Sequence, residues 1–514
     1  MATTTPLFLL LLLLSTPAMC LEPQCTTPTK DPGHRGKPSQ AGSYFVPSPS
    51  FVSTLKSTLE QISKLTSLVS SFARHAGGGR LAFAVADCLE LLDLSFDELT
   101  WTLSGGGEGK PSDLHSWLSA ALGNQDTCKE SLSDAGAAGR FIAKLVFSEL
   151  DRVTSLVSDG LREIAGAGGK QRRLMGPNIP EWVSAQDGRL LLAGQRPAVD
   201  VVVAQDGTGN YTTVAAAVEA APTESGRRYV IYVKKGVYRE NVEIKKGKWN
   251  LMLIGDGMGQ TVISGNRSFV DGWTTYRSAT LAVAGKGFIC RDLTVENTAG
   301  PAKHQAVALR SDSDLSVFYR CEFAGYQDTL YAHSLRQFFR DCYISGTVDF
   351  IFGNAAAVFQ NSQILSRRPL PEQKNTITAQ GRKDPNQNTG FSFHLCNVSA
   401  AADLVWAGTN STATYLGRPW KQYSRAVFME SYIGLVIQAE GWLEWAGDFA
   451  IETLYYGEYM NTGPGSGLAG RVKWPGFHAM LDKAEAANFT VAAFIDGNLW
   501  IPATGVKYTA DLTV

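Results

Sequence analysis

Short apolar runs that recur through the second half of the chain constrain its fold more than any other sequence feature. From residue 201 on, these runs are rich in β-branched and aromatic residues, are bounded by turn residues and recur at intervals near 20 to 24 residues. Only one short helical segment, 214–221, interrupts them, so the pattern predicts a solenoid with one coil per repeat and disfavours βαβ units. A β-sandwich is the alternative, although its strands would usually be spaced more closely. The runs are residues 229–233, 251–254, 280–283, 288–295, 306–309, 318–323, 337–344, 348–352 and 358–364.

Four polar residues fall at similar intervals within this region. Gln305 and Gln327 are 22 residues apart, Gln327 and Asp349 are again 22 apart, and Asp328 precedes Asp349 by 21. In a parallel β-helix such residues stack one coil apart, at roughly 4.8 Å. For any single aspartate, a structural role in capping a turn is the more common one. Two carboxylates this close cannot both ionise readily, so the spacing predicts one protonated acid and one carboxylate nucleophile, with amides beside them for an oxyanion.

The composition excludes several other classes of protein. The chain has 514 residues, of which 44% are hydrophobic and 51 are glycine, and this fits a packed globular protein of roughly two to four domains. Its net charge of −1 gives no overall basic footprint for nucleic acid, and there is no acidic tail. The 8 cysteines are too sparse for a disulfide scaffold.

The N-terminus has the pattern of a secretory signal. Residues 7–14 are an unbroken apolar run, too short to span a bilayer, and residues 15–18 are small or helix-breaking. We therefore expect cleavage near Cys20, a secreted, extracellular protein, and no membrane association after the signal is removed. In a secreted chain, Asn-x-Ser/Thr sequences are candidate glycosylation sites. They are Asn210, Asn266, Asn397, Asn410 and Asn488.

The segment before the β-rich region has helical periodicity. Apolar residues recur every three or four positions in four segments that short connections join, which predicts an antiparallel four-helix bundle. Cys88 and Cys128 each lie in or beside a predicted helix, and in an oxidising compartment we expect a disulfide between them. The predicted helices are residues 51–69, 80–103, 114–122 and 137–164.

A linker rich in glycine, proline and basic residues follows the helices. Arg172 and Arg173 form an exposed dibasic step in it, where a protease could separate the two halves of the chain. A plain solvated linker is the alternative, because basic pairs are common in linkers. The predicted division of the chain is a signal at 1–20, a helical bundle at 21–165, a linker at 166–196 and a β-helix at 197–514.

Several long motifs resemble plant pectin methylesterases. They include GYQDTLYAHSLRQFFRDCYISGTVDFIFGN at 325–354, HQAVALR at 304–310, LGRPWKQYSRAVFMES at 416–431 and GWLEWAGDF at 441–449. This resemblance covers about residue 197 to the C-terminus. The helical part resembles the pectin methylesterase inhibitor domain through VADCLELLDLSFDEL and SWLSAALGNQDTC. The resemblance implies an all-β, right-handed parallel β-helix catalytic domain preceded by an all-α bundle.

The resemblance also implies catalytic roles. Asp349 matches the nucleophile that attacks the methyl ester of a galacturonic acid unit, and Gln327 matches the residue that stabilises the tetrahedral intermediate, with Gln305 beside it. Asp328 matches the acid that protonates departing methanol and then activates water. Arg418 matches the residue that orients Asp349 and keeps it ionised. No metal or cofactor is implied, because methanol leaves readily once it is protonated.

Further positions match substrate contacts of the family. Trp420 matches an aromatic platform for a sugar face, and Thr275 matches another substrate contact. Tyr331, Phe352 and Trp442 are expected to line the groove. Taken alone, Trp420 would more often be ordinary packing, Gln305 part of an amide ladder inside the coil, and Arg418 a member of a surface ion pair. Their joint presence in matched motifs favours the functional roles.

The sequence departs from the family pattern at its cysteines. Family members commonly have a cysteine at the position of Ser362, which pairs with the equivalent of Cys342. The sequence leaves open whether Cys342 pairs with Cys321 or whether the cysteines of the β-rich region are all free and buried. The inhibitor-like part also lacks the second cysteine that usually follows the equivalent of Cys25. The cysteines of the β-rich region are Cys290, Cys321, Cys342 and Cys396.

The resemblance predicts a cell-wall enzyme whose partner is methyl-esterified homogalacturonan, the main chain of pectin. Inhibitor proteins and a processing protease are further expected partners, and we expect a monomer.

The alternative functions are a lyase or hydrolase on the same scaffold, and a non-catalytic pectin-binding or inhibitory protein. A lyase would need an acidic calcium-binding cluster, and the sequence offers none. The helical part is expected to inhibit the enzyme, with a role in folding or targeting as the alternative. Arg418 follows Asp349 by 69 residues, about three coils of regular length. The polar stretch 367–390 is expected to bulge out as a loop, so the two residues should be separated by fewer coils than that.

Overall fold

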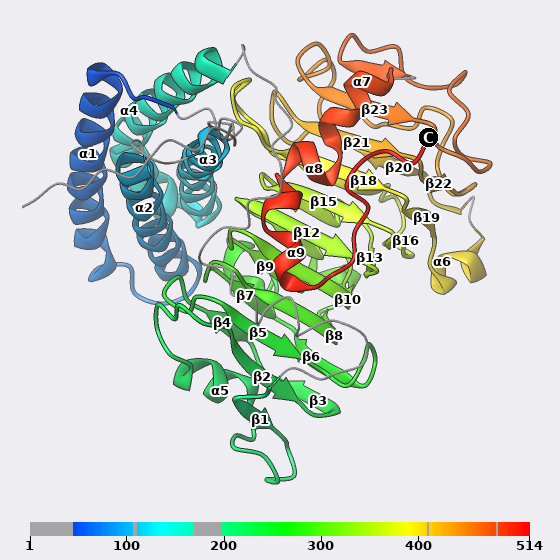
Figure 1. The fold of residues 1–514 in the computed structure, drawn as a ribbon, viewed down its shortest axis with the longest axis horizontal. Coiled ribbons are helices and arrows are strands. Elements are labelled where there is room, and N and C mark those ends of the chain that lie inside the picture. Colours follow the sequence, from blue (N-terminus) through cyan, green and yellow to red (C-terminus); the bar gives the residue numbers. More distant parts are fainter. Residues whose placement is uncertain (1–44, 106–109, 169–197, 409–410, 480–481) are drawn as a thin grey trace, which may run out of the picture. The chain divides into compact units, whose positions relative to one another are not determined.

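The computed structural model describes residues 45–105, 110–168, 198–408, 411–479 and 482–514, all of which belong to one compact unit, Ser43–Val514 (Figure 1). The predicted signal, Cys25, the dibasic pair at Arg172 and Arg173, and Asn410 lie outside these residues.

Four long helices form the N-terminal bundle. They are α1 Pro49–Ala73, α2 Arg80–Gly105, α3 Pro111–Asp134 and α4 Gly136–Gly168. Ser48 caps α1 by accepting a hydrogen bond from the Phe51 backbone N–H, and the apolar face of α1 is buried against the other helices. A disulfide joins Cys88 of α2 to Cys128 of α3.

Helix α3 is longer than the predicted 114–122, since it continues to Asp134. Its second half is polar, so hydrophobic periodicity could not reveal it. Several of its polar side chains are buried, and the Asn124 amide donates to Ser95 at 3.2 Å and to Glu98 at 3.0 Å. Buried hydrogen bonds, rather than apolar contacts, therefore hold this half of the helix.

The β-rich part is a parallel β-helix, since every strand pairing among the described residues is parallel. The predicted fold class, a β-helix after a four-helix bundle, is confirmed. One sheet carries the site, and its strands are β4 Val242–Ile244, β7 Leu281–Val283, β9 Leu309–Ser311, β11 Leu330–Ala332, β14 Ile351–Gly353, β17 Asn375–Gln380 and β20 Thr414–Gly417.

The remaining strands wind into the other, larger sheet. They are β1 Val201–Val203, β2 Tyr229–Val233, β3 Gly236–Arg239, β5 Leu251–Ile254, β6 Thr261–Gly265, β8 Ile289–Asn297, β10 Ser316–Ala324, β12 Arg336–Arg340, β13 Tyr343–Gly346, β15 Ala356–Gln360, β16 Gln363–Ser366, β18 Gly390–His394, β19 Asn397–Ala400, β21 Arg425–Met429, β22 Tyr432–Ile433, β23 Tyr455–Tyr459 and β24 Phe477–Ala479. The short helices of this part are α5 Val214–Ala220, α6 Ala402–Ala407, α7 Lys483–Ala486, α8 Val491–Phe494 and α9 Ile501–Thr504, and α8 and α9 pack against the larger sheet (Figure 1). None of the helices in the described segments is long and apolar enough to cross a membrane.

The stacking interval at the site is 21 residues, which corrects the 22-residue interval taken from the sequence. Leu330 pairs with Leu309 on one side and with Ile351 on the other. Asp328 and Asp349 precede two paired residues by the same two positions and are therefore the residues that stack. Gln327 is one position out of that register.

The stretch 367–390 is not simply a loop, because β17 lies within it. Strand β17 pairs with β14 on one side and with β20 on the other, so Arg418, just after β20, is two coils from Asp349 rather than three. The extra residues lie in the connections on either side of β17. All residues of β17, NTITAQ, are buried, but their polar composition gives no apolar run from which the strand could be predicted.

A column of stacked rings fills the interior of the coil. Neighbouring rings are 4.4 to 4.7 Å apart and come from strands that pair in register. In-register winding thus makes one aromatic position per coil reinforce the next. The rings are Phe318, Phe339, Phe359, Phe393 and Phe428. The cysteines of this part, Cys290, Cys321, Cys342 and Cys396, are free and buried.

Replacing Phe359 with alanine tests this column. The side chain is fully buried between two stacked neighbours, so we expect Phe359→Ala to lower the free energy of unfolding by ~3–5 kcal/mol. Leu435, which is 65% exposed, gives a control, Leu435→Ala, expected to change it by about 0.5 kcal/mol or less. Denaturant titration followed by far-UV circular dichroism measures both, and equal effects would contradict the role of the column.

Candidate active site

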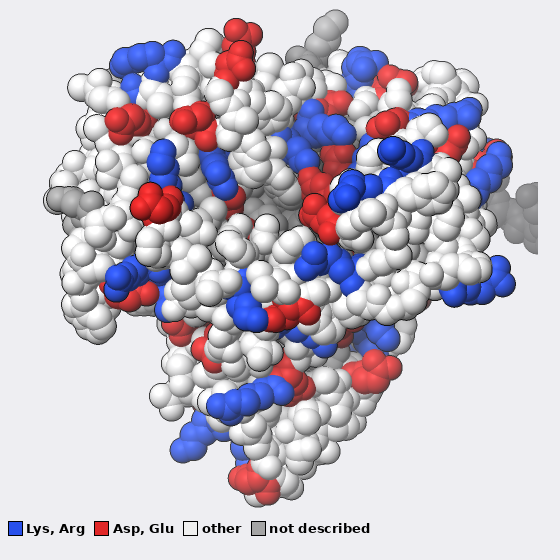
Figure 2. All heavy atoms as spheres, turned by 180° about the vertical axis from the view of Figure 1, so that it is seen from behind, with Lys and Arg blue, Asp and Glu red and all other residues white. Residues whose placement is uncertain are grey.

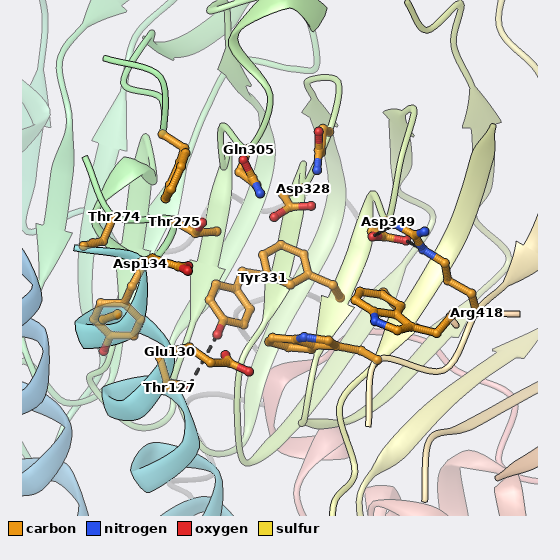
Figure 3. Close-up of a pocket in the computed structure, with 18 residues that line it drawn as sticks. Thr127, Glu130, Asp134, Thr274, Thr275, Gln305, Asp328, Tyr331, Asp349 and Arg418 are labelled. Atoms are coloured by element: carbon orange, nitrogen blue, oxygen red, sulfur yellow. Dashed lines mark hydrogen bonds and ion pairs between the residues drawn. The ribbon is translucent and has the colours of Figure 1, made fainter. Parts of the chain in front are cut away.

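A cavity of about 420 Å³ opens over the sheet of β4, β7, β9, β11, β14, β17 and β20. Its wall includes Gln305, Gln327, Asp328, Asp349 and Arg418, which the winding of the chain brings together from four coils (Figure 3). The structure therefore gathers in one cavity all the residues to which the sequence analysis gave catalytic roles.

Asp349 lies just before β14 and is held on both carboxylate oxygens. The Arg418 guanidinium donates from Nε to Oδ1 at 2.8 Å and from Nη2 to Oδ2 at 2.7 Å. The Thr376 hydroxyl donates to Oδ1 at 2.6 Å and accepts the backbone N–H of Asp349 at 2.9 Å. A bidentate guanidinium contact favours the ionised carboxylate and fixes its orientation.

Asp328 is buried one coil away from Asp349. Burial, and then the negative charge of Asp349, raise the pKa of Asp328 well above its ordinary value, and the more distant Arg418 only partly opposes them. Arg418 bonds only one of the two carboxyl groups, so their environments differ. Burial and the adjacent anion therefore favour the protonated form of Asp328, while the bidentate Arg418 contact favours a carboxylate at Asp349.

Both aspartates have left-handed backbone conformations, with φ of 63° at Asp328 and 51° at Asp349. Residues other than glycine adopt such angles at some cost, and asparagine and aspartate do so most readily. A left-handed residue also breaks the alternation of a strand. This is why the consecutive residues Gln327 and Asp328 can both line the cavity.

An aromatic wall adjoins the two aspartates. Tyr331 and Phe352 stack with ring centroids 4.0 Å apart, and Trp420 meets the Phe352 ring edge to face at 5.9 Å. Thr275 and Phe269 continue the lining. Flat apolar faces next to hydrogen-bonding groups suit a sugar ring, whose two sides are apolar and whose rim is polar.

The prediction that Trp442 lines the groove is wrong. It is buried in the core, where it stacks on Tyr456 at 4.1 Å and donates from its indole N–H to Glu458. Trp445 lines the cavity instead, with the Arg418 guanidinium 4.4 Å from its ring centroid. The two tryptophans are three residues apart in GWLEWAG, and only the coordinates could separate the core one from the exposed one.

Helix α3 supplies a wall of the same cavity through Thr127, Glu130, Ser131 and Asp134. Sequence analysis missed these residues because it ended the helix at residue 122. Burial raises the pKa of Glu130, although Lys421 opposes the shift, and burial also raises the pKa of Asp134. In Figure 3 the labelled side chains of Glu130 and Asp134 lie near Tyr331.

The candidate glycosylation sites differ in exposure. Asn210 and Asn266 are exposed, whereas Asn397 and Asn488 are half-buried. Asn397 donates a hydrogen bond from its side-chain amide to Gln363. Glycosylation at these four sites stays a prediction, and exposure favours the first two.

No group of histidine, cysteine, aspartate or glutamate in the described segments could hold a metal ion. The cavity holds an arginine-bound carboxylate, a buried carboxyl group and two amide side chains. Together with the parallel β-helix, this arrangement is typical of a hydrolase and suits a reaction through paired aspartates.

Comparison with known proteins agrees with this class. A family model described as pectinesterase matches residues 200–498, and one described as plant invertase/pectin methylesterase inhibitor matches residues 26–162. A pectinesterase/pectinesterase inhibitor of Prunus persica is 59% identical over 475 residues, with 90% of each chain covered. A probable pectinesterase/pectinesterase inhibitor of Arabidopsis thaliana is 53% identical over 488 residues, which cover 91% of this chain and 92% of that one.

A solved structure matches the β-rich part. A pectin methylesterase from carrot is 54% identical, covers 62% of this chain and is itself covered completely, with a TM-score of 0.61. The chain therefore belongs to the pectinesterase family, and it carries an inhibitor-type domain ahead of the esterase domain.

The contrast between the two carboxyl groups can be tested by titration. We expect Asp349→Asn to lower the pKa of Asp328, because it removes the neighbouring anion and frees the Arg418 charge. Carboxyl infrared or carbon NMR titration of Asp328 measures the shift. The exposed Asp511 provides the control Asp511→Asn, which should leave that pKa unchanged. An Asp328 pKa that stays the same or rises in the Asp349 variant would contradict this description.

Proposed function

We propose that this pectinesterase is a secreted cell-wall enzyme that removes methyl esters from galacturonic acid units of pectin and releases methanol. The observation that supports it best is the Arg418-held carboxylate of Asp349 beside the buried carboxyl of Asp328. We infer a monomeric enzyme whose partners are methyl-esterified homogalacturonan, inhibitor proteins and a processing protease.

The proposed reaction has two stages. The Asp349 carboxylate attacks the ester carbonyl carbon, and the amides of Gln327 and Gln305 donate hydrogen bonds to the oxyanion. As the intermediate collapses, the bond to the methoxy group breaks and Asp328 gives its proton to the departing methanol. The products of this stage are free methanol and an acyl-enzyme anhydride on Asp349.

Water completes the cycle. Asp328, now ionised, removes a proton from water while the oxygen attacks the anhydride carbonyl. The anhydride bond breaks, Asp349 leaves as a carboxylate, and the sugar unit leaves as an acid. Asp328 is again protonated, and Arg418 again holds the ionised Asp349, so the site returns to its starting state.

The walls of the cavity would position the chain of sugars. Trp420, Tyr331 and Phe352 provide the aromatic faces, and Thr275 provides a polar contact at the other end of the cavity. Trp445 replaces Trp442 in this proposal, because Trp442 is buried in the core.

Substitution of the nucleophile tests the proposed reaction. We expect Asp349→Asn to lower methanol release from methylated pectin by at least ~10³-fold, since an amide cannot form the acyl-enzyme. Far-UV circular dichroism should show an unchanged fold. The control Asp511→Asn should retain full activity. Methanol release at the original rate by the Asp349 variant would refute the assignment, and unsaturated sugar ends in the product would indicate a lyase instead.

We also infer that the bundle restrains the enzyme by covering the cavity. Thr127 of α3 lies 2.8 Å from His333 and 3.4 Å from the Tyr331 hydroxyl, between the helix and the aromatic wall. The Gln387 side-chain amide donates to the Ser119 carbonyl oxygen at 2.9 Å. A polymer cannot reach Asp328 and Asp349 along a path that α3 occupies. A role in folding or targeting is the alternative.

The pH should control how firmly the bundle is held. Docking against the β-helix buries Glu130, and burial raises its pKa despite Lys421, while Asp126 and Asp134 add to the rise. A carboxyl whose pKa rises on docking takes up a proton, so docking is favoured at low pH and weakens as the pH rises through the ordinary pKa towards the raised one.

The test is a chain with a protease site inserted in residues 169–197 and then cut. We expect the two parts to separate, and methanol release to increase, as the pH rises, with the dissociation constant changing by up to about tenfold per pH unit for one proton. Gel filtration and methanol assays measure this. Glu130→Gln should flatten the dependence, whereas Glu60→Gln, at an exposed position on α1, should not. Equal rates for the cut, separated chain and the intact chain at every pH would remove the inhibitory role.

A further inference from the structure

Ion pairs between the bundle and the β-helix all have the same polarity. In each such pair among the described residues, the carboxylate belongs to the bundle and the cation to the β-helix. On the face drawn in Figure 2, basic and acidic side chains gather around a hollow. The basic members of these pairs are Lys246, Arg277, Arg310, Arg336, Lys383 and Lys421.

Some of these cations are also neutralised within the β-helix, and others are not. Arg310 and Arg336 each have a carboxylate of the β-helix as well, in Asp312 at 3.0 Å and Asp314 at 2.7 Å. For Lys383 and Lys421, the carboxylate partners in the described part of the chain lie on α3 only. Without the bundle, these two lysines would carry uncompensated charge.

Lys421 adjoins the cavity, and Lys383 follows a strand of the cavity wall. Lys421 follows Trp420, which lines the cavity, and its ammonium group is 5.0 Å from the Trp420 ring centroid. Lys383 follows β17, the strand that contributes Ala379 to the cavity wall. Lys421 pairs with Glu130, another residue of that wall, and Lys383 pairs with Asp126 at 2.6 Å.

Helix α3 presents its acids as a regular row. Asp126, Glu130 and Asp134 are four residues apart, so they project from one face of the helix, about 6 Å apart along its axis. The last two line the cavity itself. A pectin chain that has lost its methyl groups is likewise a stiff chain with a carboxylate on every unit, whereas the methylated chain carries none.

We infer that Lys383 and Lys421 form a subsite for the ionised carboxylates of galacturonic acid units that have already lost their methyl groups. Helix α3 occupies this subsite with Asp126 and Glu130 while the bundle is docked. The inference rests on the proposed function, because it takes the cavity to be where pectin binds. On this inference, the acidic side chains of the bundle imitate the carboxylates of the demethylated product, and the bundle also blocks the cavity sterically.

The recognition is one of charge. An ammonium group attracts a carboxylate and donates to it, while a methyl ester has no net charge and is the weaker acceptor. Burial lowers the pKa of Lys421, but Glu130 and Asp126 raise it above its ordinary value, so Lys421 is charged in the docked state. The side chains of Lys421 and Lys383 are 24% and 39% exposed even when docked, so an incoming chain could reach them as the bundle leaves.

The experiment measures binding of fully demethylated and fully methylated oligogalacturonides by calorimetry. It uses the catalytic part released from the cut chain. The carrot pectin methylesterase matches only 62% of this chain and is itself covered completely, which supports the catalytic part folding on its own. We expect Lys421→Met and Lys383→Met each to weaken binding of the demethylated oligomer about tenfold and to leave binding of the methylated oligomer within about twofold.

Lys246→Met is the matched control. Lys246 is 34% exposed, and its carboxylate partners among the described residues, Asp93 and Asp97, also belong to the bundle. They lie on α2, however, whereas α3 is the helix that lines the cavity. Substitution of Lys246 should leave both affinities within about twofold. Equal weakening by all three substitutions would show a general cationic surface and overturn the subsite.

A competition measurement gives an independent result. The demethylated oligomer, but not the methylated one at the same concentration, should displace the bundle from the cut, undissociated chain. Displacement by neither oligomer, together with unchanged affinities in both lysine variants, would overturn the inference. Methanol release is not used in either assay, so a failure of the esterase proposal would be seen separately.

Discussion

The paired contact between the Arg418 guanidinium and the Asp349 carboxylate is the interaction on which the site depends. Parallel winding with a 21-residue interval stacks Asp328 and Asp349 one coil apart, and two buried carboxylates at that separation repel each other when both are ionised. Arg418, two coils away from Asp349 along the chain, bonds only one of them. This asymmetry favours the charge on Asp349 and the proton on Asp328.

The winding of the β-helix produces this asymmetry by bringing distant residues together. Residues 69 positions apart meet because β14, β17 and β20 are neighbours in one sheet. The stacked rings inside the coil hold successive turns in register, so the register also sets the positions of the residues that follow or precede each strand. Left-handed backbone recurs at several turns of the coil, and at Asp328 and Asp349 it lies where the chemistry is proposed.

Much of this architecture could be predicted from the sequence. Regular apolar runs indicate coils, and helical periodicity indicates a bundle, because both reflect burial on one face. The motifs around Asp328, Asp349 and Arg418 gave the candidate site. Two of the failures have a common cause: α3 beyond residue 122 and strand β17 are rich in polar residues that hydrogen bonds hold in place, so apolar periodicity does not reveal them. Trp442 was misplaced because the sequence does not show which side of a turn faces inward.

The one-residue error in the stacking interval shows the same limit. Intervals of 21 and 22 residues both occur among the polar residues, and only the strand register separates them. Contacts between α3 and the cavity were also beyond sequence analysis, since they join residues about 200 positions apart. In the proposed function, those contacts decide whether substrate can reach the site.

Neutron diffraction from deuterium-exchanged crystals, grown at neutral pH, tests the central claim most directly, because it shows which of the two carboxyl groups carries the proton. The account predicts a deuteron on the Asp328 carboxyl and none on Asp349. A deuteron on Asp349 with Asp328 ionised would contradict it.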